Sequence, residues 1–77
     1  SMKLPNKAIS YKKSVLPLFP IILDTLNNSY YSPRELYQKL NKKIDNITQF
    51  TDAVTCLYAL GKIDMTENGV LYYVETN

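Results

Sequence analysis

The chain has 77 residues, of which 45% are hydrophobic, and this is enough for one small domain with a modest core. It contains one Cys and no His, which excludes an internal disulfide and a four-ligand metal cluster. The net charge is +2, but residues 1–43 hold eight of the nine basic residues and residues 44–77 hold five of the seven acidic ones.

One domain is expected over residues 2–77, and Ser1 before Met2 is interpreted as a remnant of cloning. The apolar run from Val15 to Leu23 is too short to span a bilayer and contains two prolines. No membrane contact is therefore expected. A reducing cytoplasm fits the single Cys.

The first predicted helix begins at Ser14 or Val15, with Ser14 as its N-cap, and ends near Asn27. Pro20 must remove a backbone hydrogen bond or restart the helix, so a kink or a 3₁₀ turn is expected there. The spacing of apolar residues predicts a buried stripe of Val15, Phe19, Ile22 and Leu26. The preceding segment, Lys3 to Tyr11, is a candidate edge strand for a C-terminal hairpin.

The second predicted helix has a clear start signal. Ser32 is expected to be its N-cap, Pro33 its first residue and Glu35 the return partner of a capping box. The helix is expected to end near Lys43. Its apolar positions predict a buried face of Leu36, Leu40 and Ile44.

The third predicted helix runs from an Asn46 N-cap, paired with Gln49, to a stop at Gly61. Its predicted buried face comprises Ile47, Phe50, Ala53, Val54, Leu57 and Leu60. Its predicted outward face comprises Thr48, Asp52, Thr55 and Ala59. This helix contains no Lys, Arg or His.

Beyond Gly61 the hydrophobic pattern alternates, and Asn68-Gly69 predicts a two-residue type I′ turn between two strands. The register set by this turn predicts a core-facing set of Ile63, Met65, Tyr72 and Val74. Leu71 and Tyr73 would then point away from the core as an exposed apolar anchor for a partner.

Three helices followed by a two-stranded hairpin indicate an α+β winged helix-turn-helix, in which the third helix normally faces DNA. A helix with Asp52 and no cation is a poor reader of phosphates. The sequence therefore favours a protein-contact surface, with candidate residues Ile21, Thr48, Asp52, Thr55, Ala59, Leu71 and Tyr73.

Nucleic-acid binding is the alternative function. It would use Lys39, Lys42 and Lys43 together with the N-terminal lysines, which are Lys3, Lys7, Lys12 and Lys13. An enzyme is not expected, because Cys56 has no His to serve as its base. Nor is a metal or other cofactor expected.

A family resemblance rests on four stretches: Leu4-Pro5-Asn6-Lys7-Ala8-Ile9, Ser10-Tyr11-Lys12-Lys13-Ser14, Glu35-Leu36-Tyr37 and Asp52-Ala53-Val54-Thr55-Cys56-Leu57-Tyr58-Ala59-Leu60-Gly61-Lys62-Ile63. In these stretches the chain resembles the small middle components of bacterial ABC-three-component systems. The resemblance implies a noncatalytic adaptor between an SMC-like ABC ATPase and an effector protein of the same operon in anti-phage defence. DNA would then be contacted only indirectly. A second copy of the chain is also a candidate partner.

Overall fold

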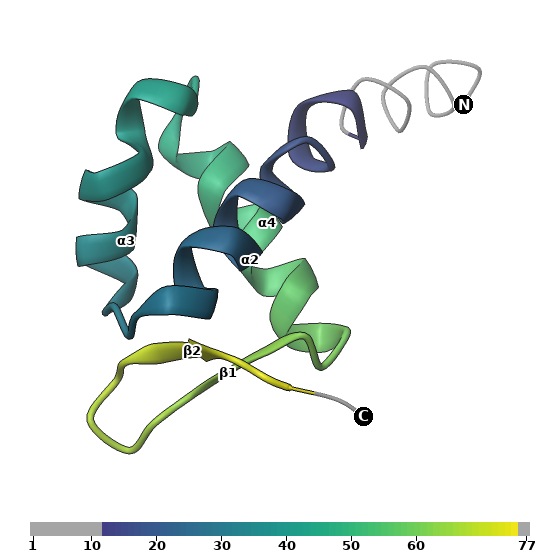
Figure 1. The fold of residues 1–77 in the computed structure, drawn as a ribbon. Helices are drawn as coiled ribbons and strands as arrows, with labels where there is room; N and C mark the ends of the chain where they lie inside the picture. Colours follow the sequence, from purple (N-terminus) through teal and green to yellow (C-terminus); the bar gives the residue numbers. More distant parts are fainter. Residues whose placement is uncertain (1–11, 76–77) are drawn as a thin grey trace.

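The protein is described over residues 12–75 of a computed structural model. The elements in this range are α2 (Leu18–Asn28), α3 (Pro33–Leu40), the 3₁₀ turn η1 (Asn41–Lys43), α4 (Ile47–Ala59), β1 (Ile63–Met65) and β2 (Leu71–Tyr73). Figure 1 shows the hairpin of β1 and β2 closing the end of the molecule where α2 and α4 end and α3 begins. The predicted α+β class, with three helices before a hairpin, is confirmed. The candidate edge strand from Lys3 to Tyr11 lies outside the described residues.

Proline decides where α2 begins, at a different place from the one predicted. Residues 12–15 are helical, residues 16–17 form a turn, and Pro17 is the N-cap of α2. Pro20 lies in the first turn of α2, where backbone N–H groups have no helical partner and none is lost. The helix therefore breaks at Pro17, and Ser14 lies within the preceding helical segment instead of capping α2.

The start of α3 follows its predicted capping box. The Ser32 hydroxyl accepts a hydrogen bond from the Glu35 N–H at 3.1 Å, and the Glu35 carboxylate accepts one from the Ser32 N–H at 3.0 Å. Pro33 is the first helical residue. The capping box thus satisfies two backbone donors, and η1 carries the chain on to Lys43.

The start of α4 is capped by Asn46, as predicted. Its side-chain oxygen accepts a hydrogen bond from the Gln49 N–H at 2.8 Å. The return bond lies one residue earlier than predicted, because the side-chain oxygen (Oε1) of Gln49 accepts a hydrogen bond from the Asp45 N–H at 2.9 Å. The Gln49 amide also donates to the backbone carbonyl of Ser14, which ties the start of α4 to the helical residues 12–15.

The end of α4 is a Schellman motif at the predicted Gly61. The φ angle of Gly61 is 76°, a left-handed conformation that glycine adopts without strain. Its N–H donates to the Tyr58 carbonyl at 3.0 Å, and the Lys62 N–H donates to the Leu57 carbonyl at 3.0 Å. These bonds satisfy the last carbonyls of the helix and turn the chain into β1.

The core lies between the helices and the inner face of the hairpin. Its buried apolar side chains are Val15, Leu18, Ile22, Leu26, Leu36, Leu40, Ile44, Phe50, Ala53, Leu57, Ile63 and Leu71. Two residues of the third predicted helix that were expected in this core, Ile47 and Leu60, are instead 52% and 62% exposed. They are the first residue and the C-cap of α4. Helical periodicity predicts which side of a helix faces the core, but not how far along the helix the neighbouring elements cover that side.

The hairpin turn contains three residues instead of the predicted two. The Thr66 N–H donates to the Val70 carbonyl at 2.8 Å, and the Thr66 hydroxyl accepts from the Val70 N–H at 3.1 Å. Gly69 has a φ of 81°, whereas Asn68 has no positive φ. A type I′ turn needs positive φ at both positions, so this is a type I turn followed by a left-handed glycine.

The extra turn residue moves the side chains of β2 to the opposite face. Met65 pairs with Leu71 and Ile63 with Tyr73, where Tyr72 and Val74 had been expected. Leu71 is completely buried and Tyr73 packs against the core, whereas Met65 is 41% exposed. The predicted outward placement of Leu71 and Tyr73 is therefore wrong, and Leu71 is not available to a partner.

A short extended segment between α2 and α3 joins the hairpin. The Tyr31 N–H donates to the Leu71 carbonyl at 3.3 Å, and the Leu71 N–H donates to the Tyr31 carbonyl at 2.7 Å. At Leu71, β2 therefore lies between β1 on one side and Tyr31 on the other. This bridge fixes the face of β2 that meets the core.

The turn can be tested by replacing Gly69 and Asn68 with alanine, one at a time. Gly69→Ala should lower the free energy of unfolding by about 1–2 kcal/mol, because an L residue at this φ is strained. No described atom lies within 4 Å of the added Cβ, so the loss reports backbone strain alone. Asn68→Ala should have a smaller effect. Urea denaturation of both variants measures the difference, and equal losses would indicate the type I′ turn instead.

Candidate functional site

The side of α4 that points away from the core forms one continuous surface, which we call the α4 outer face. Its exposed or half-buried side chains are Ile47, Thr48, Thr51, Asp52, Thr55, Tyr58 and Ala59. Ile47 and Tyr58, near its two ends, are each 52% exposed. Asp52 is the only charged residue of α4. The α4 outer face therefore consists mainly of small, uncharged side chains, with a large apolar side chain near each end.

Three buried side chains fix the rotation of α4 and so define the α4 outer face. Phe50, Ala53 and Leu57 are between 0% and 4% exposed. The Phe50 ring also meets the Tyr37 ring edge to face, with centroids 5.2 Å apart. Because helical positions repeat every 3.6 residues, locking this side inward leaves the opposite side to solvent.

The chemistry of the α4 outer face suits contact with protein better than contact with phosphate. Threonine and alanine let another backbone approach closely, and Ile47 and Tyr58 provide apolar area of the kind found at interfaces. Phosphate recognition requires cations or free backbone donors. The α4 outer face offers no cation, and Asp52 would repel a phosphate.

Four of the seven predicted partner-contact residues share the α4 outer face, namely Thr48, Asp52, Thr55 and Ala59. The other three lie elsewhere. Ile21 is half-buried against the core and borders a hollow beside Pro20 and Lys43. Leu71 is buried within the core and Tyr73 packs against it.

The alternative nucleic-acid residues Lys39, Lys42 and Lys43 are exposed at the end of α3 and in η1. The Lys39 ammonium lies 5.6 Å from the centroid of the Tyr31 ring, which is a cation–π contact. These lysines lie outside the α4 outer face. Basic and acidic residues are equal in number among residues 12–75, so the described part of the chain has no overall positive charge.

The N-terminal lysines divide into two pairs. Lys12 and Lys13 are exposed in the helical segment 12–15, at the opposite end of α2 from the hairpin (Figure 1). Lys3 and Lys7 lie outside the described residues.

Cys56 is half-buried at the border of the α4 outer face. Within residues 12–75, no group of three or more Cys, Asp or Glu side chains is placed to hold a metal ion. No helix in the same range has the length and apolar character needed to cross a bilayer.

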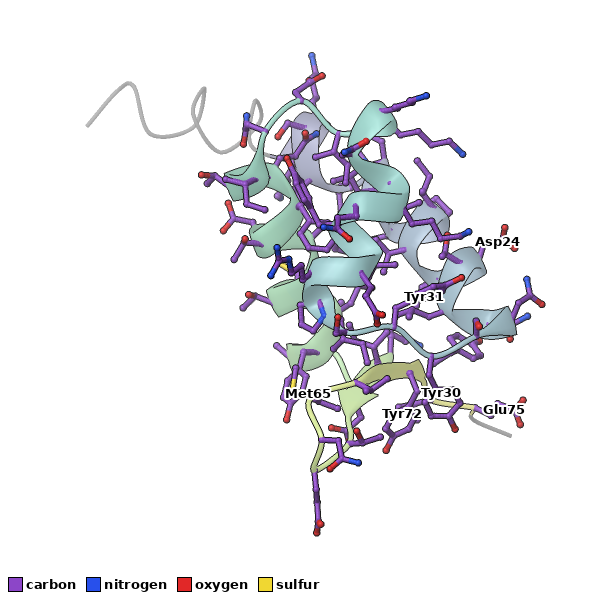
Figure 2. The ribbon with its side chains drawn as sticks, turned by 90° about the vertical axis from the view of Figure 1, so that its left-hand side faces the viewer. Asp24, Tyr30, Tyr31, Met65, Tyr72 and Glu75 are labelled. Atoms are coloured by element: carbon purple, nitrogen blue, oxygen red, sulfur yellow. The ribbon has the colours of Figure 1, made fainter. Side chains whose placement is uncertain are left out.

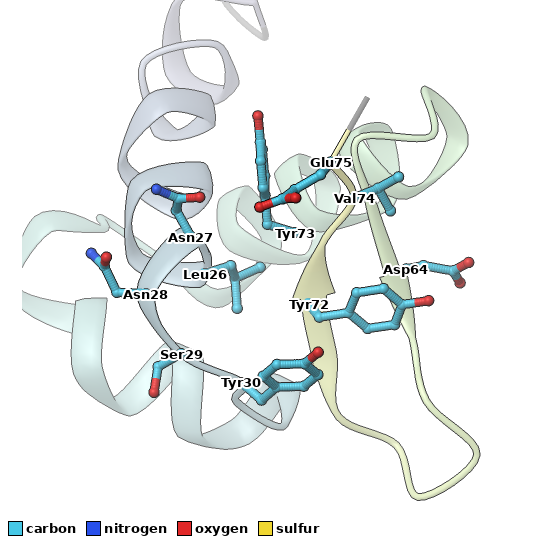
Figure 3. A pocket seen from close by; sticks show the side chains of 10 residues that line it. All are labelled: Leu26, Asn27, Asn28, Ser29, Tyr30, Asp64, Tyr72, Tyr73, Val74 and Glu75. Atoms are coloured by element: carbon cyan, nitrogen blue, oxygen red, sulfur yellow. The ribbon is translucent and has the colours of Figure 1, made fainter. Parts of the chain in front are cut away.

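A cleft of about 620 Å³, which the sequence did not predict, lies between the end of α2 and β2. Its walls come from residues 26–30 and 72–75, with Asp64 at its border. The Tyr30 and Tyr72 rings stack with centroids 5.6 Å apart and planes 23° from parallel, as Figure 3 shows. The predicted register had placed Tyr72 in the core, so the cleft could not be foreseen.

Comparison with known protein families identifies a match. A profile of the family described as ABC-three component (ABC-3C) system Middle Component 7 matches residues 4–72. No curated protein and no solved structure matches the chain. Because the profile extends over most of the 77 residues, the chain belongs to the ABC-three-component Middle Component 7 family.

Proposed function

We propose that this protein is a noncatalytic adaptor that binds a partner protein through the α4 outer face. The observation that carries the proposal is the composition of that face, which is exposed, carries Ile47 and Tyr58 and has no cation. The family description supports it, because a middle component of a three-component system has other components to join.

We propose that the domain that carries the α4 outer face has a winged-helix fold. The order of three helices and a hairpin supports this assignment, as does the pairing of Tyr31 with β2. In a winged helix-turn-helix that binds DNA, the helix equivalent to α4 would enter the major groove. Here we propose that the same helix contacts protein.

The partners that we propose are an SMC-like ABC ATPase and an effector protein encoded in the same operon, acting together in the cytoplasm in anti-phage defence. Co-expression of all three proteins with an affinity tag on this chain tests the proposal. Because the α4 outer face is nearly uncharged, the complex should persist when salt is raised from about 50 to 200 mM. An adaptor joins both proteins, so the absence of the ATPase or of the effector from the recovered complex would contradict this function.

Nucleic-acid binding is kept as a second candidate, because Lys39, Lys42 and Lys43 are all exposed. We expect little or no gel shift of a random DNA duplex at about 150–200 mM salt, where nonspecific phosphate contacts weaken sharply. The triple change of these lysines to Gln should leave that result unchanged. A wild-type shift at this salt that the triple variant loses would favour nucleic-acid binding over the adaptor.

A further inference from the structure

The wall of the cleft formed by β2 includes a strand edge that has no partner strand among residues 12–75. We infer that this edge binds an extended segment of another protein as an additional β-strand, with Lys or Arg side chains of that segment facing the cleft. The inference does not depend on the α4 outer face, and it stands or fails separately from the proposed adaptor function.

The open edge follows from the hydrogen bonds on either side of β2. Leu71 exchanges both of its backbone bonds with Tyr31, whereas Val74 donates to the Lys62 carbonyl on the β1 side. Backbone groups of alternate residues point to the same edge of a strand. The N–H and C=O of Tyr73 therefore point to the Tyr31 side, into the cleft.

The residue that would continue this ladder opposite Tyr73 is Ser29. Ser29 has an extended backbone, with φ −165° and ψ 161°, but it is the C-cap of α2. The chain there leaves the sheet and enters the helix. Among residues 12–75, no backbone hydrogen bond joins Ser29 to Tyr73, so the ladder stops after the single pair of Tyr31 and Leu71.

The chemistry of an open strand edge selects its occupant. Alternating N–H and C=O groups are matched by the backbone of another extended chain, which is the basis of recognition by strand addition. Proteins usually protect such edges with Lys, Pro or a bulge. Residues 72–75, Tyr-Tyr-Val-Glu, include neither Lys nor Pro, and their one charge is Glu75, which disfavours an acidic strand but not a basic one.

The charge around the cleft indicates a basic occupant. Asp64 and Glu75 border it, and among the described residues no Lys or Arg does. Tyr30 is 64% exposed and stacked on Tyr72, which provides an aromatic surface for a cation. Figure 2 shows Tyr30, Tyr72 and Glu75 on one side of the hairpin and Met65 on the other.

The same charges argue against a second copy of this chain. Pairing two β2 edges around a twofold axis would place the Glu75 carboxylates of both copies close to one another. Like charges across a strand pair are destabilising. A Lys- or Arg-bearing segment of a different protein meets both the backbone and the charge requirements.

Binding of model peptides tests the inference on the whole chain. The probe is a dye-labelled peptide of about eight residues that alternates Lys and Val. Its binding, followed by fluorescence anisotropy, should shift the Tyr73 amide resonance in a ¹⁵N spectrum. A Glu and Val peptide should bind about tenfold more weakly, because attraction to Asp64 and Glu75 becomes repulsion. Equal binding of both peptides, or no binding of either, would overturn the inference.

Backbone N-methylation separates strand pairing from simple charge attraction. Methylating the Lys and Val peptide at all N–H groups of one edge should abolish binding, and methylating the other edge should leave it intact. If both methylated peptides bind equally, no strand is added. If binding emerges only after residues 2–11 are removed, the edge belongs to the chain's own N-terminal segment and the inference is wrong.

A matched pair of variants localises the site. Glu75→Lys should weaken binding of the Lys and Val peptide about tenfold. Glu67→Lys makes the same change of charge at the exposed turn of the hairpin, outside the cleft, and should have little effect. If both variants weaken binding equally, the peptide responds to the net charge of the protein and does not bind at the cleft, and the inferred site is wrong. A wild-type dimer that protects the Tyr73 amide would assign the edge to a second copy instead.

Discussion

Leu71→Ala is expected to lower the free energy of unfolding by about 2–5 kcal/mol, the range for removing a buried leucine side chain. Leu71 is 0% exposed and is among the largest fully buried side chains of the protein. Small domains have only a few kcal/mol of stability to lose. The melting temperature followed by circular dichroism should therefore fall by more than about 10 °C.

Met65→Ala is the matched control, because Met65 lies directly opposite Leu71 in the hairpin. Its side chain is 41% exposed, and its truncation should change stability by less than about 1 kcal/mol. The pair of variants tests the hairpin register directly. If Met65→Ala lowers the free energy of unfolding more than Leu71→Ala does, the hairpin has the register of the two-residue turn.

The helix ends that could be predicted from the sequence depend on residues close together in the chain. Ser32 and Glu35 form their capping box within one turn of helix. Gly61 needs only its own freedom of φ and the carbonyls just before it. Because all partners of these contacts are local, their chemistry is visible in a few consecutive residues, and both predictions are confirmed.

The hairpin register could not be predicted, because Asn68-Gly69 fits two turns that differ by one residue. Local chemistry permits either, and the choice depends on which side chains of β2 reach the core. Here Leu71 does so, and its backbone pairs with Tyr31 forty residues away in the sequence. A contact between distant segments thus decides the face of every residue in β2.

The same distinction explains which part of the candidate site was predicted. Thr48, Thr55 and Ala59 on the α4 outer face follow from helical periodicity within one element. The cleft requires the end of α2 to stand beside β2, and no local pattern indicates that placement. The exposure of Ile47 and Leu60 likewise depends on where neighbouring elements stop.

The second large effect is expected from substitutions on the α4 outer face, which should impair binding of the partner protein. Thr51→Arg combined with Thr55→Arg should reduce capture of the partner protein more than about a hundredfold, because two guanidinium groups would be buried without partners at the interface. Both threonines are exposed, and arginine favours helix more than threonine does. The melting temperature should therefore change little, which separates lost binding from lost folding.

The matched control for charge is Gln38→Arg with Asn41→Arg, at exposed positions near the end of α3. It adds the same two charges beside the exposed lysines and away from the α4 outer face, so partner capture should persist. Binding of a DNA duplex by each double variant, measured by gel shift, shows whether the added positive charge alone creates nucleic-acid binding. If Thr51→Arg with Thr55→Arg keeps full capture, the partner does not bind α4. If the Gln38 and Asn41 double variant loses capture instead, the contact lies at the end of α3, and the adaptor surface proposed here is wrong.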